Sequence, residues 1–449
     1  MNYKKLLIIF ILPLITYANT FYINKFKQYN FSYAIFDLKK SKYIQKYNIH
    51  QKFPPASLLK IFSSYYLIKY FPDSLLKNNI YGLDGFLVND TILYGNVIIK
   101  LTGNPLTGSE YSNIPNPINN FFKIIKQKRK INKIKKDIII DYSYLPYIKE
   151  NNYIYNYQKK WFYAAPACGI NYNLNSFSII INNYKNIPFI SISPPIADIN
   201  IAKNIHYLAN IKSNIHITIN KFNNIKITGQ INKNIKTYTL KLSITQPDIF
   251  IQKLIKYYLN FYKITLNGKI IVSKKSYIPI ELDTLLIEKP YSLEKILKIA
   301  NFESSNFIFE QLFLILQQND NTNLISNWVK HILKDKNFNI VDYSGLSGKN
   351  YLSINQFIEL LTYIYNSDYL TWQKLINVLP TDKKIQFFNN IKYENITIKT
   401  GLLENTFSLF LYSDKSQRIY IFFFDKIKEN NMKQIIKKLK KLLLNFNQL

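Results

Sequence analysis

Residues 54–71 read PPASLLKIFSSYYLIKYF, a proline break followed at once by a helical pattern. The two prolines end extended structure, and Ser57 opens the helix. Ser57 and Lys60 are three residues apart, so their side chains lie on one helix face. A helix N-terminus favours negative charge on the serine oxygen, and a nearby lysine is a base if desolvation lowers its pKa. The stretch predicts a nucleophilic serine, although S-x-x-K alone also fits an ordinary helix cap.

A second motif, Ser304-Ser305-Asn306, leads into another predicted helix. A hydroxyl at Ser304 can pass a proton to a leaving amine, and the amide of Asn306 can hold a substrate carbonyl. Taken alone, the motif is also a common way to cap a helix.

A third motif, Lys399-Thr400-Gly401, follows the predicted strand 396–399. Lys399 can supply a cationic field or anchor a terminal carboxylate, and Thr400 can donate a hydrogen bond to that carboxylate. Gly401 lets a substrate backbone lie close to the strand. By itself this is an unremarkable strand end.

The two ends of the chain carry strand patterns. Residues 31–38 and 43–47 predict one hairpin, and residues 406–412 and 418–424 predict another. We expect both ends to share one sheet. The basic amphipathic segment 432–446 predicts a helix that either packs on this sheet or lies on an anionic membrane.

The middle of the chain, residues 85–283, predicts a β-rich region, and helical patterns return at 293–300 and 306–316. The most basic part of this middle region, residues 123–136, predicts a solvent-exposed helix face. The alternative is a nucleic-acid-binding patch.

Composition indicates a globular protein: 449 residues with 47% hydrophobic and 19% charged side chains. The net charge of +32 comes from lysines spread along the whole chain, which indicates compositional drift and a general attraction to anionic surfaces such as wall polymers. The alternative is nucleic-acid binding. The lone Cys168 predicts a small core residue, and the four histidines lack metal-ligand spacing.

The N-terminus predicts export. Lys4 and Lys5 precede an apolar run over residues 6–15, and Thr16-Tyr17-Ala18 offers a cleavage site. This is the pattern of a signal peptide over residues 1–18, and an uncleaved anchor is the alternative.

Together the three motifs resemble those of the serine β-lactamase and penicillin-binding superfamily. The long stretch between the first two resembles the class C low-molecular-mass penicillin-binding proteins, the D-alanyl-D-alanine carboxypeptidase/endopeptidase family. Further segments resemble that family as well: LYGNVIIKLTGNPLT at 93–107, DIIIDYSYL at 137–145, YAAPACGINYNLNSF at 163–177 and DYSGLS at 342–347.

The resemblance implies an α/β fold: a β-lactamase/transpeptidase-like domain, with an antiparallel sheet flanked by helices and a large β-rich insertion. The transpeptidase-like domain would comprise residues 19–84 and 284–449, with the inserted domain or domains at 85–283.

The resemblance also implies the chemistry. Ser57 would be acylated with Lys60 as its base, and the proton network would be completed by Ser304, Asn306 and Lys399. Thr400 and Gly401 would meet the substrate, and the N–H groups of Ser57 and Leu402 would form the oxyanion hole.

The implied enzyme needs no cofactor or metal. Its partners would be peptidoglycan stem peptides and, as covalent inhibitors, β-lactams. It would bind no nucleic acid and would be periplasmic, with at most peripheral membrane association. The alternatives are a serine β-lactamase or esterase and a non-catalytic wall-binding protein.

Several positions depart from the family pattern. Asn104 replaces an Asp, Tyr343 a Gly and Gly348 an Arg, and the segment 155–159 carries no acid. These changes leave the catalytic set intact and alter the segments expected to recognise the amino end of the stem-peptide side chain.

Overall fold

The structure is a computed structural model, and it describes residues 26–149, 154–220, 224–318, 322–381 and 396–446. The chain folds as two compact units. Unit 1 comprises Met1–Tyr70, Leu297–Ser304 and Thr322–Leu449, and unit 2 comprises Phe71–Ile296 and Ser305–Asn321. The predicted signal peptide, residues 1–18, lies outside the described residues.

Unit 1 is built on a five-stranded antiparallel sheet in the order β2-β1-β22-β21-β20. β1 pairs with β22 along its whole length, from Asn30 opposite Asp425 to Asp37 opposite Arg418. The two ends of the chain therefore share one sheet, as the sequence predicts. The strands are β1 Asn30–Asp37, β2 Lys42–Tyr47, β20 Ile396–Leu403, β21 Thr406–Ser413 and β22 Arg418–Asp425.

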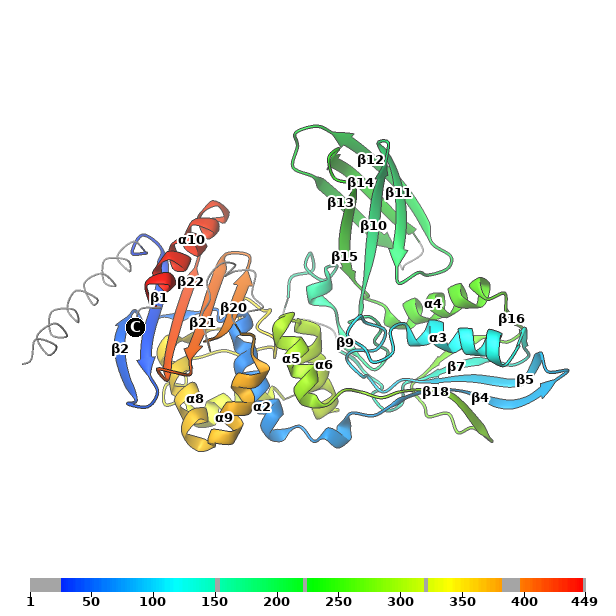
Figure 1. Ribbon diagram of the computed structural model, residues 1–449, viewed down its shortest axis with the longest axis horizontal. Helices are drawn as coiled ribbons and strands as arrows, with labels where there is room; N and C mark the ends of the chain where they lie inside the picture. Colours follow the sequence, from blue (N-terminus) through cyan, green and yellow to red (C-terminus); the bar gives the residue numbers. More distant parts are fainter. Residues whose placement is uncertain (1–25, 150–153, 221–223, 319–321, 382–395, 447–449) are drawn as a thin grey trace, which may run out of the picture. The chain divides into compact units, whose positions relative to one another are not determined.

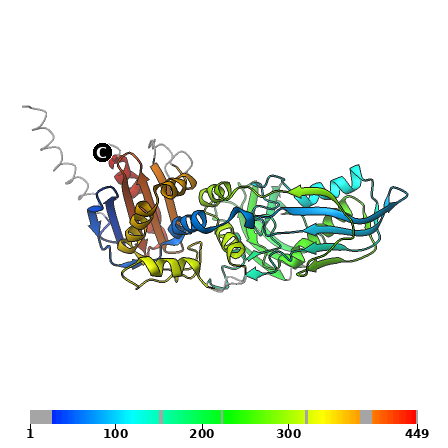
Figure 2. The same ribbon diagram turned by 90° about the horizontal axis from the view of Figure 1, so that it is seen from below.

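One face of this sheet is covered by α10, Glu429–Phe446 (Figures 1 and 2). The side chains of Ile435 and Leu439 are fully buried in a cluster with alternate residues of β1, β21 and β22, among them Phe422 and Phe424. The interpretation of this segment as a core helix is thereby confirmed. In the described part of the chain, no helix is both long enough and apolar enough to cross a bilayer.

The other face of the sheet is covered by helices that include the predicted nucleophile helix. The ring of Phe357 lies 4.4 Å from that of Phe62 and 5.8 Å from that of Phe423, which joins helix, helix and sheet. The fold class is therefore the predicted antiparallel sheet flanked by helices. The elements are α2 Leu59–Tyr70, α7 Leu324–Ile332, α8 Ile354–Ser367, α9 Tyr369–Val378 and the short pair β3 Lys52–Phe53 with β19 Leu352–Ser353.

Unit 2 contains a seven-stranded mixed sheet, with β16-β6-β5-β4-β18 in order and β7 pairing with β5 and β17. The helices α3 Pro117–Lys123, α4 Pro247–Phe261 and α6 Asn306–Gln317 also belong to it, and α5 Leu293–Phe302 begins in unit 2 and ends in unit 1. The sheet comprises β4 Asn79–Val88, β5 Ile92–Lys100, β6 Lys133–Ile134, β7 Ile138–Asp141, β16 Thr265–Leu266, β17 Ile270–Ser273 and β18 Leu282–Glu288.

Two three-stranded sheets complete the core of unit 2, in the orders β11-β10-β15 and β12-β14-β13. β8 and β9 form a separate pair. These strands are β8 Ile148–Lys149, β9 Ala167–Cys168, β10 Ser176–Tyr184, β11 Ile187–Ser193, β12 Asn200–Leu208, β13 Asn214–Asn220, β14 Asn224–Asn232 and β15 Thr237–Ser243.

The structure corrects the prediction of a helix face over residues 123–136. Only its beginning is helical, because α3 passes into a wider turn at Ile124–Lys128 and the chain then enters β6. Cys168 is buried as predicted, and burial raises the pKa of its thiol well above the ordinary value.

Candidate active site

The predicted nucleophile stands where the chain turns into α2. A single 3₁₀ turn, Ala56–Leu58, precedes the helix, and Ala56 has a φ of 48°, in the left-handed region that costs energy for a residue with a Cβ. Ser57 is half-buried at this turn, and Lys60 is fully buried. The Nζ of Lys60 donates a hydrogen bond to Ser57 Oγ at 2.8 Å. The predicted side-chain pair is therefore formed.

Lys60 is also held by a loop that sequence reasoning did not assign to the site. Its Nζ donates to the carbonyl of Ser344 at 2.6 Å. The loop is fixed by the Asp342 carboxylate, which accepts from the N–H groups of Gly345 and Ser347, both at 2.6 Å. Gly345 has a φ of 76° and packs so closely that a Cβ there would lie 1.9 Å from Ala56 O. The resemblance of the DYSGLS segment to the family marked this loop, but not its carbonyl contact with Lys60.

The second predicted lysine forms a matching pair. Lys399 is buried and its Nζ donates to Ser304 Oγ at 2.9 Å. Burial lowers the pKa of Lys399 from 10.5 to about 7. In the described residues no carboxylate forms an ion pair with it. Ser304 has a φ of 51°, so a second residue of the site, after Ala56, stands at a strained backbone position.

Gly401 connects the two pairs. A Cβ on Gly401 would lie 2.8 Å from the backbone nitrogen of Ser57, so the strand passes directly against the predicted nucleophile. Lys399 is two residues earlier on the same strand and therefore projects from the same face, about 7 Å along it. The structure thus brings both lysine–serine pairs to one face of β20.

The backbone of β20 presents polar groups on the side away from β21. Ile398 N–H donates in that direction, to Pro380 O at 2.8 Å. In an antiparallel pair this direction alternates, so the N–H groups of Thr400 and Leu402 face outward as well. The side chain of Thr400 projects from the opposite face to that of Lys399, beside its partner Leu409.

Asn306 belongs to unit 2, unlike the other predicted catalytic residues. It is the first residue of α6, and its Nδ2 donates to Tyr163 O at 2.9 Å. The Oγ of Ser305 accepts from Ile308 N–H at 3.3 Å, so Ser305 caps the helix and leaves Ser304 to meet Lys399.

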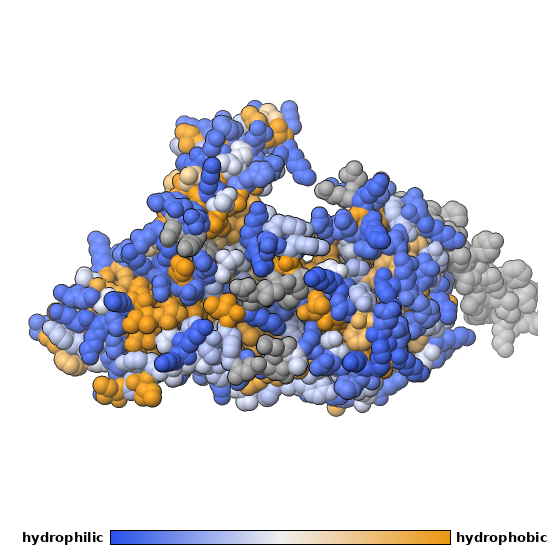
Figure 3. Space-filling view, turned by 180° about the vertical axis from the view of Figure 1, so that it is seen from behind, coloured by the Kyte–Doolittle hydropathy of each residue, from blue (hydrophilic) through white to orange (hydrophobic). Residues whose placement is uncertain are grey.

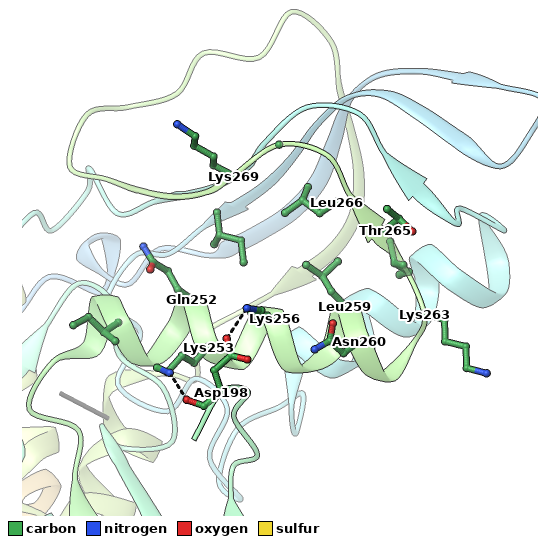
Figure 4. Close-up of a pocket in the computed structure, with 14 residues that line it drawn as sticks. Asp198, Gln252, Lys253, Lys256, Leu259, Asn260, Lys263, Thr265, Leu266 and Lys269 are labelled. Carbon is green, nitrogen blue, oxygen red and sulfur yellow. Dashed lines mark hydrogen bonds and ion pairs between the residues drawn. The ribbon is translucent and has the colours of Figure 1, made fainter. Parts of the chain in front are cut away.

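A separate cleft of about 850 Å³ lies in unit 2 between α4 and the strands β16 and β17 (Figure 4). Lysines and amides line it, and Lys256 forms a 2.5 Å ion pair with Asp198 at its edge. None of the residues predicted for catalysis lines this cleft. Within the described ranges, no three or more His, Cys, Asp or Glu side chains are placed to share a metal ion.

Comparison with known proteins adds independent information. A model of the D-Ala-D-Ala carboxypeptidase 3 (S13) family matches residues 22–445. The crystal structure of penicillin binding protein 4 (dacB) from Haemophilus influenzae has a TM-score of 0.71 at 18% identity, covering 94% of this chain and 96% of that chain. Its complex with a novel β-lactam has a TM-score of 0.67 at the same identity and coverage. The search of curated proteins found no match.

Proposed function

Because the chain belongs to the D-Ala-D-Ala carboxypeptidase 3 (S13) family, it is a serine-type D-Ala-D-Ala carboxypeptidase that acts on peptidoglycan, and we propose that Ser57 is its nucleophile. One observation carries the proposal: two buried lysines each contact a serine hydroxyl, Lys60 with Ser57 at 2.8 Å and Lys399 with Ser304 at 2.9 Å. A hydroxyl within hydrogen-bond reach of an amine is what an activated serine requires.

In the acylation step, neutral Lys60 takes the proton of Ser57 as Oγ attacks the carbonyl carbon of the penultimate D-Ala. A C–O bond forms, and the carbonyl oxygen becomes an oxyanion. The N–H groups of Ser57 and Leu402 are assigned to this oxyanion, because both are backbone donors on the side of the site where Gly401 meets the helix start.

The peptide C–N bond then breaks, and the leaving D-Ala amine needs a proton. Ser304 supplies it and recovers one through Lys399, whose lowered pKa lets the amine exist in both forms near neutrality. Water then attacks the ester carbon and gives a proton through Ser304 to Lys399, now neutral. The bond from that carbon to Ser57 Oγ breaks, and Lys60 returns its proton to Ser57 Oγ. The roles of Asn306 toward a substrate carbonyl and of Thr400 toward the terminal carboxylate stay predictions.

The substrates proposed are peptidoglycan stem peptides that end in D-Ala, cleaved as a carboxypeptidase or as an endopeptidase with the same acyl transfer. β-Lactams are proposed as covalent inhibitors. The support is the family and the fold shared with the Haemophilus influenzae protein, whose structure was determined with a β-lactam.

Mass spectrometry after benzylpenicillin treatment tests the nucleophile. The adduct should lie on the peptide that contains Ser57, and Ser57→Ala should abolish it. Ser64→Ala, two turns further along the same helix, is the matched control and should be acylated like the wild type. An adduct on any other serine contradicts the assignment, and rapid hydrolysis of the penicillin would indicate a β-lactamase.

We further propose that the protein is exported, loses residues 1–18 and works in the periplasm. The support is the N-terminal pattern and membership of a family of cell-wall peptidases. The mature N-terminus should be Asn19 by intact-mass measurement. Retention of residues 1–18 in membrane fractions would establish the anchor instead.

A further inference from the structure

Unit 2 exposes four large hydrophobic side chains at one end of its mixed sheet. The exposed fractions are 98% for Ile280, 85% for Ile278, 65% for Phe86 and 41% for Tyr94. Phe86 and Tyr94 are cross-strand partners on β4 and β5, and their rings stack at 5.8 Å. We call these four residues the isoleucine–aromatic tip. Hydrophobic surface at this end of unit 2 is visible at the left of Figure 3.

The loop that carries the two isoleucines is anchored from beneath. The buried carboxylate of Asp84 accepts from the N–H groups of Ile280 at 3.1 Å and Glu281 at 3.2 Å, and from the hydroxyl of Tyr277 at 2.5 Å. Burial acts to raise the pKa of Asp84, but these hydrogen bonds outweigh it and lower the pKa. Because the anchor stays charged, the loop is fixed, and the isoleucines are held in their exposed positions.

The anchor also places the isoleucines beside the aromatic pair. Asp84 and Phe86 are two residues apart on β4, so they project from the same face about 7 Å from each other. Since the N–H of Ile280 is bonded to Asp84, this part of the loop lies near the two rings. Scattered exposed apolar residues are ordinary, but a gathered and anchored group marks an interaction site.

Basic side chains surround this surface. Lys130 and Lys133 flank Asn132, whose N–H donates to Thr91 O in the β4–β5 turn, and the ammonium of Lys135 lies over the Tyr94 ring, 5.3 Å from its centroid. Acids are present too, with Glu281 exposed beside the isoleucines and Asp90 at the β4–β5 turn. Lysines nevertheless predominate around the tip, as they do in the whole chain, which carries +32.

The size of the surface decides between a protein partner and a lipid. A stable protein interface buries about 800 Å² per partner and uses about 20–30 residues. The tip offers four side chains on a loop and a hairpin end. Apolar side chains with flanking lysines suit the boundary between acyl chains and anionic headgroups. We propose that the isoleucine–aromatic tip inserts into the surface of an anionic phospholipid bilayer and holds the enzyme there reversibly.

Co-sedimentation of the mature full-length protein with vesicles tests the proposal, which does not depend on the chemistry at Ser57. The vesicles contain phosphatidylcholine alone or with phosphatidylglycerol. The wild type should bind the anionic vesicles, and Ile278→Ser with Ile280→Ser should lower the partition coefficient at least about tenfold. Penicillin labelling at an unchanged rate shows that the variant folds.

A matched control uses another exposed apolar pair of the same unit. Ile187→Ser with Phe189→Ser removes side chains that are 63% and 66% exposed on β11 and should change binding less than twofold. Binding by the Ile278/Ile280 variant equal to that of the wild type overturns the proposal. So does an ultracentrifugation result in which the wild type is a dimer that ignores vesicles and the variant is a monomer.

Insertion has a direct readout as well. Phe86→Trp places a fluorophore at the tip, and brominated phospholipid should quench its emission relative to the wild-type background. Equal quenching in wild type and variant would place the tip outside the bilayer and also overturn the proposal.

Discussion

Lys399 in unit 1 and Glu288 in unit 2 are both buried ionisable groups, and their surroundings differ. The carboxylate of Glu288 accepts from Asn79 at 2.8 Å and Tyr81 at 3.2 Å through one oxygen, and from Ser112 at 2.7 Å through the other. Lys399 is bonded to the Ser304 hydroxyl, and its pKa falls to about 7. A buried charge with a full set of fixed donors is structural, whereas a buried amine beside a hydroxyl is able to exchange protons.

The largest effect that this comparison predicts is on catalysis. Lys399→Met keeps the side-chain length and removes the amine, so acylation by benzylpenicillin should slow at least about 100-fold. Lys60→Ala should act similarly. Stopped-flow labelling measures the rate, and Lys415→Ala in the exposed β21–β22 turn is the control. Normal acylation by Lys60→Ala would show that the proposed base is wrong.

Glu288→Ala should mainly affect stability. The substitution leaves the buried donors of Asn79, Tyr81 and Ser112 without their acceptor, which should cost about 3 kcal/mol of unfolding free energy. Urea denaturation measures this cost. The acylation rate per folded molecule should match that of the wild type, and a large loss of rate would mean that Glu288 has a catalytic role.

The pH dependence of acylation should report Lys399. Because Ser304 recovers its proton from the protonated form of Lys399, kcat/KM for benzylpenicillin should fall about tenfold per pH unit above pH 7. This fall of kcat/KM with pH should be absent in Lys399→Met. A rate that instead falls below pH 7 would mean that the neutral form of Lys399 is the active one.

Stability should respond to pH through the same lysine. Its folded-state pKa of about 7 is below the ordinary value of 10.5, so the unfolded chain binds more protons between these values and stability rises with pH across that window. Lys399→Met has no buried amine, so it lacks the loss of stability that the wild type has at low pH. Its melting temperature should exceed that of the wild type at pH 6, and the difference should shrink by pH 10. A difference that does not change with pH would refute the lowered pKa.

Glu288→Gln should have the smallest effect. An amide can accept from Asn79 and Tyr81 through its oxygen and donate to the Ser112 hydroxyl through its nitrogen, so each buried group keeps a partner. Unfolding free energy should change by less than about 1 kcal/mol. A loss as large as that of Glu288→Ala would show that the charge itself is needed.

Much of unit 1 was predictable because its patterns are local. The hairpin at 31–47 and the helix at 432–446 follow alternation and helical periodicity, and the structure has them at nearly the predicted bounds. In unit 2 the helix α4 was not predicted, because residues 85–283 as a whole were interpreted as β-rich. Segments rich in Ile and Asn do not distinguish clearly between strand and helix. The helix predicted across 123–136 ended early because Ile134 is needed as a strand residue in the core.

The site was predictable where chemistry depends on short spacing. Ser57 and Lys60 are one turn apart, so their contact follows from helix geometry. The contact of Lys399 with Ser304 depends on tertiary packing, and only the resemblance pointed to it. The role of the Ser344 carbonyl could not be foreseen, because any residue type supplies a carbonyl. The left-handed φ of Ala56 was equally hidden, since alanine gives no signal for that conformation.

The pairing of β1 with β22 has a consequence for the order in which the enzyme becomes active. A ribosome makes Ser57 and Lys60 early, whereas Lys399 and all three strands β20, β21 and β22 come from the last part of the chain. Strand β1, which precedes Ser57 in the chain, therefore lacks its sheet neighbour β22 until translation is almost complete. Such distant pairing is slow to form. A prematurely terminated chain therefore contains Ser57 and Lys60 without the strand that supplies Lys399, so we expect unfinished copies to lack the proposed proton network.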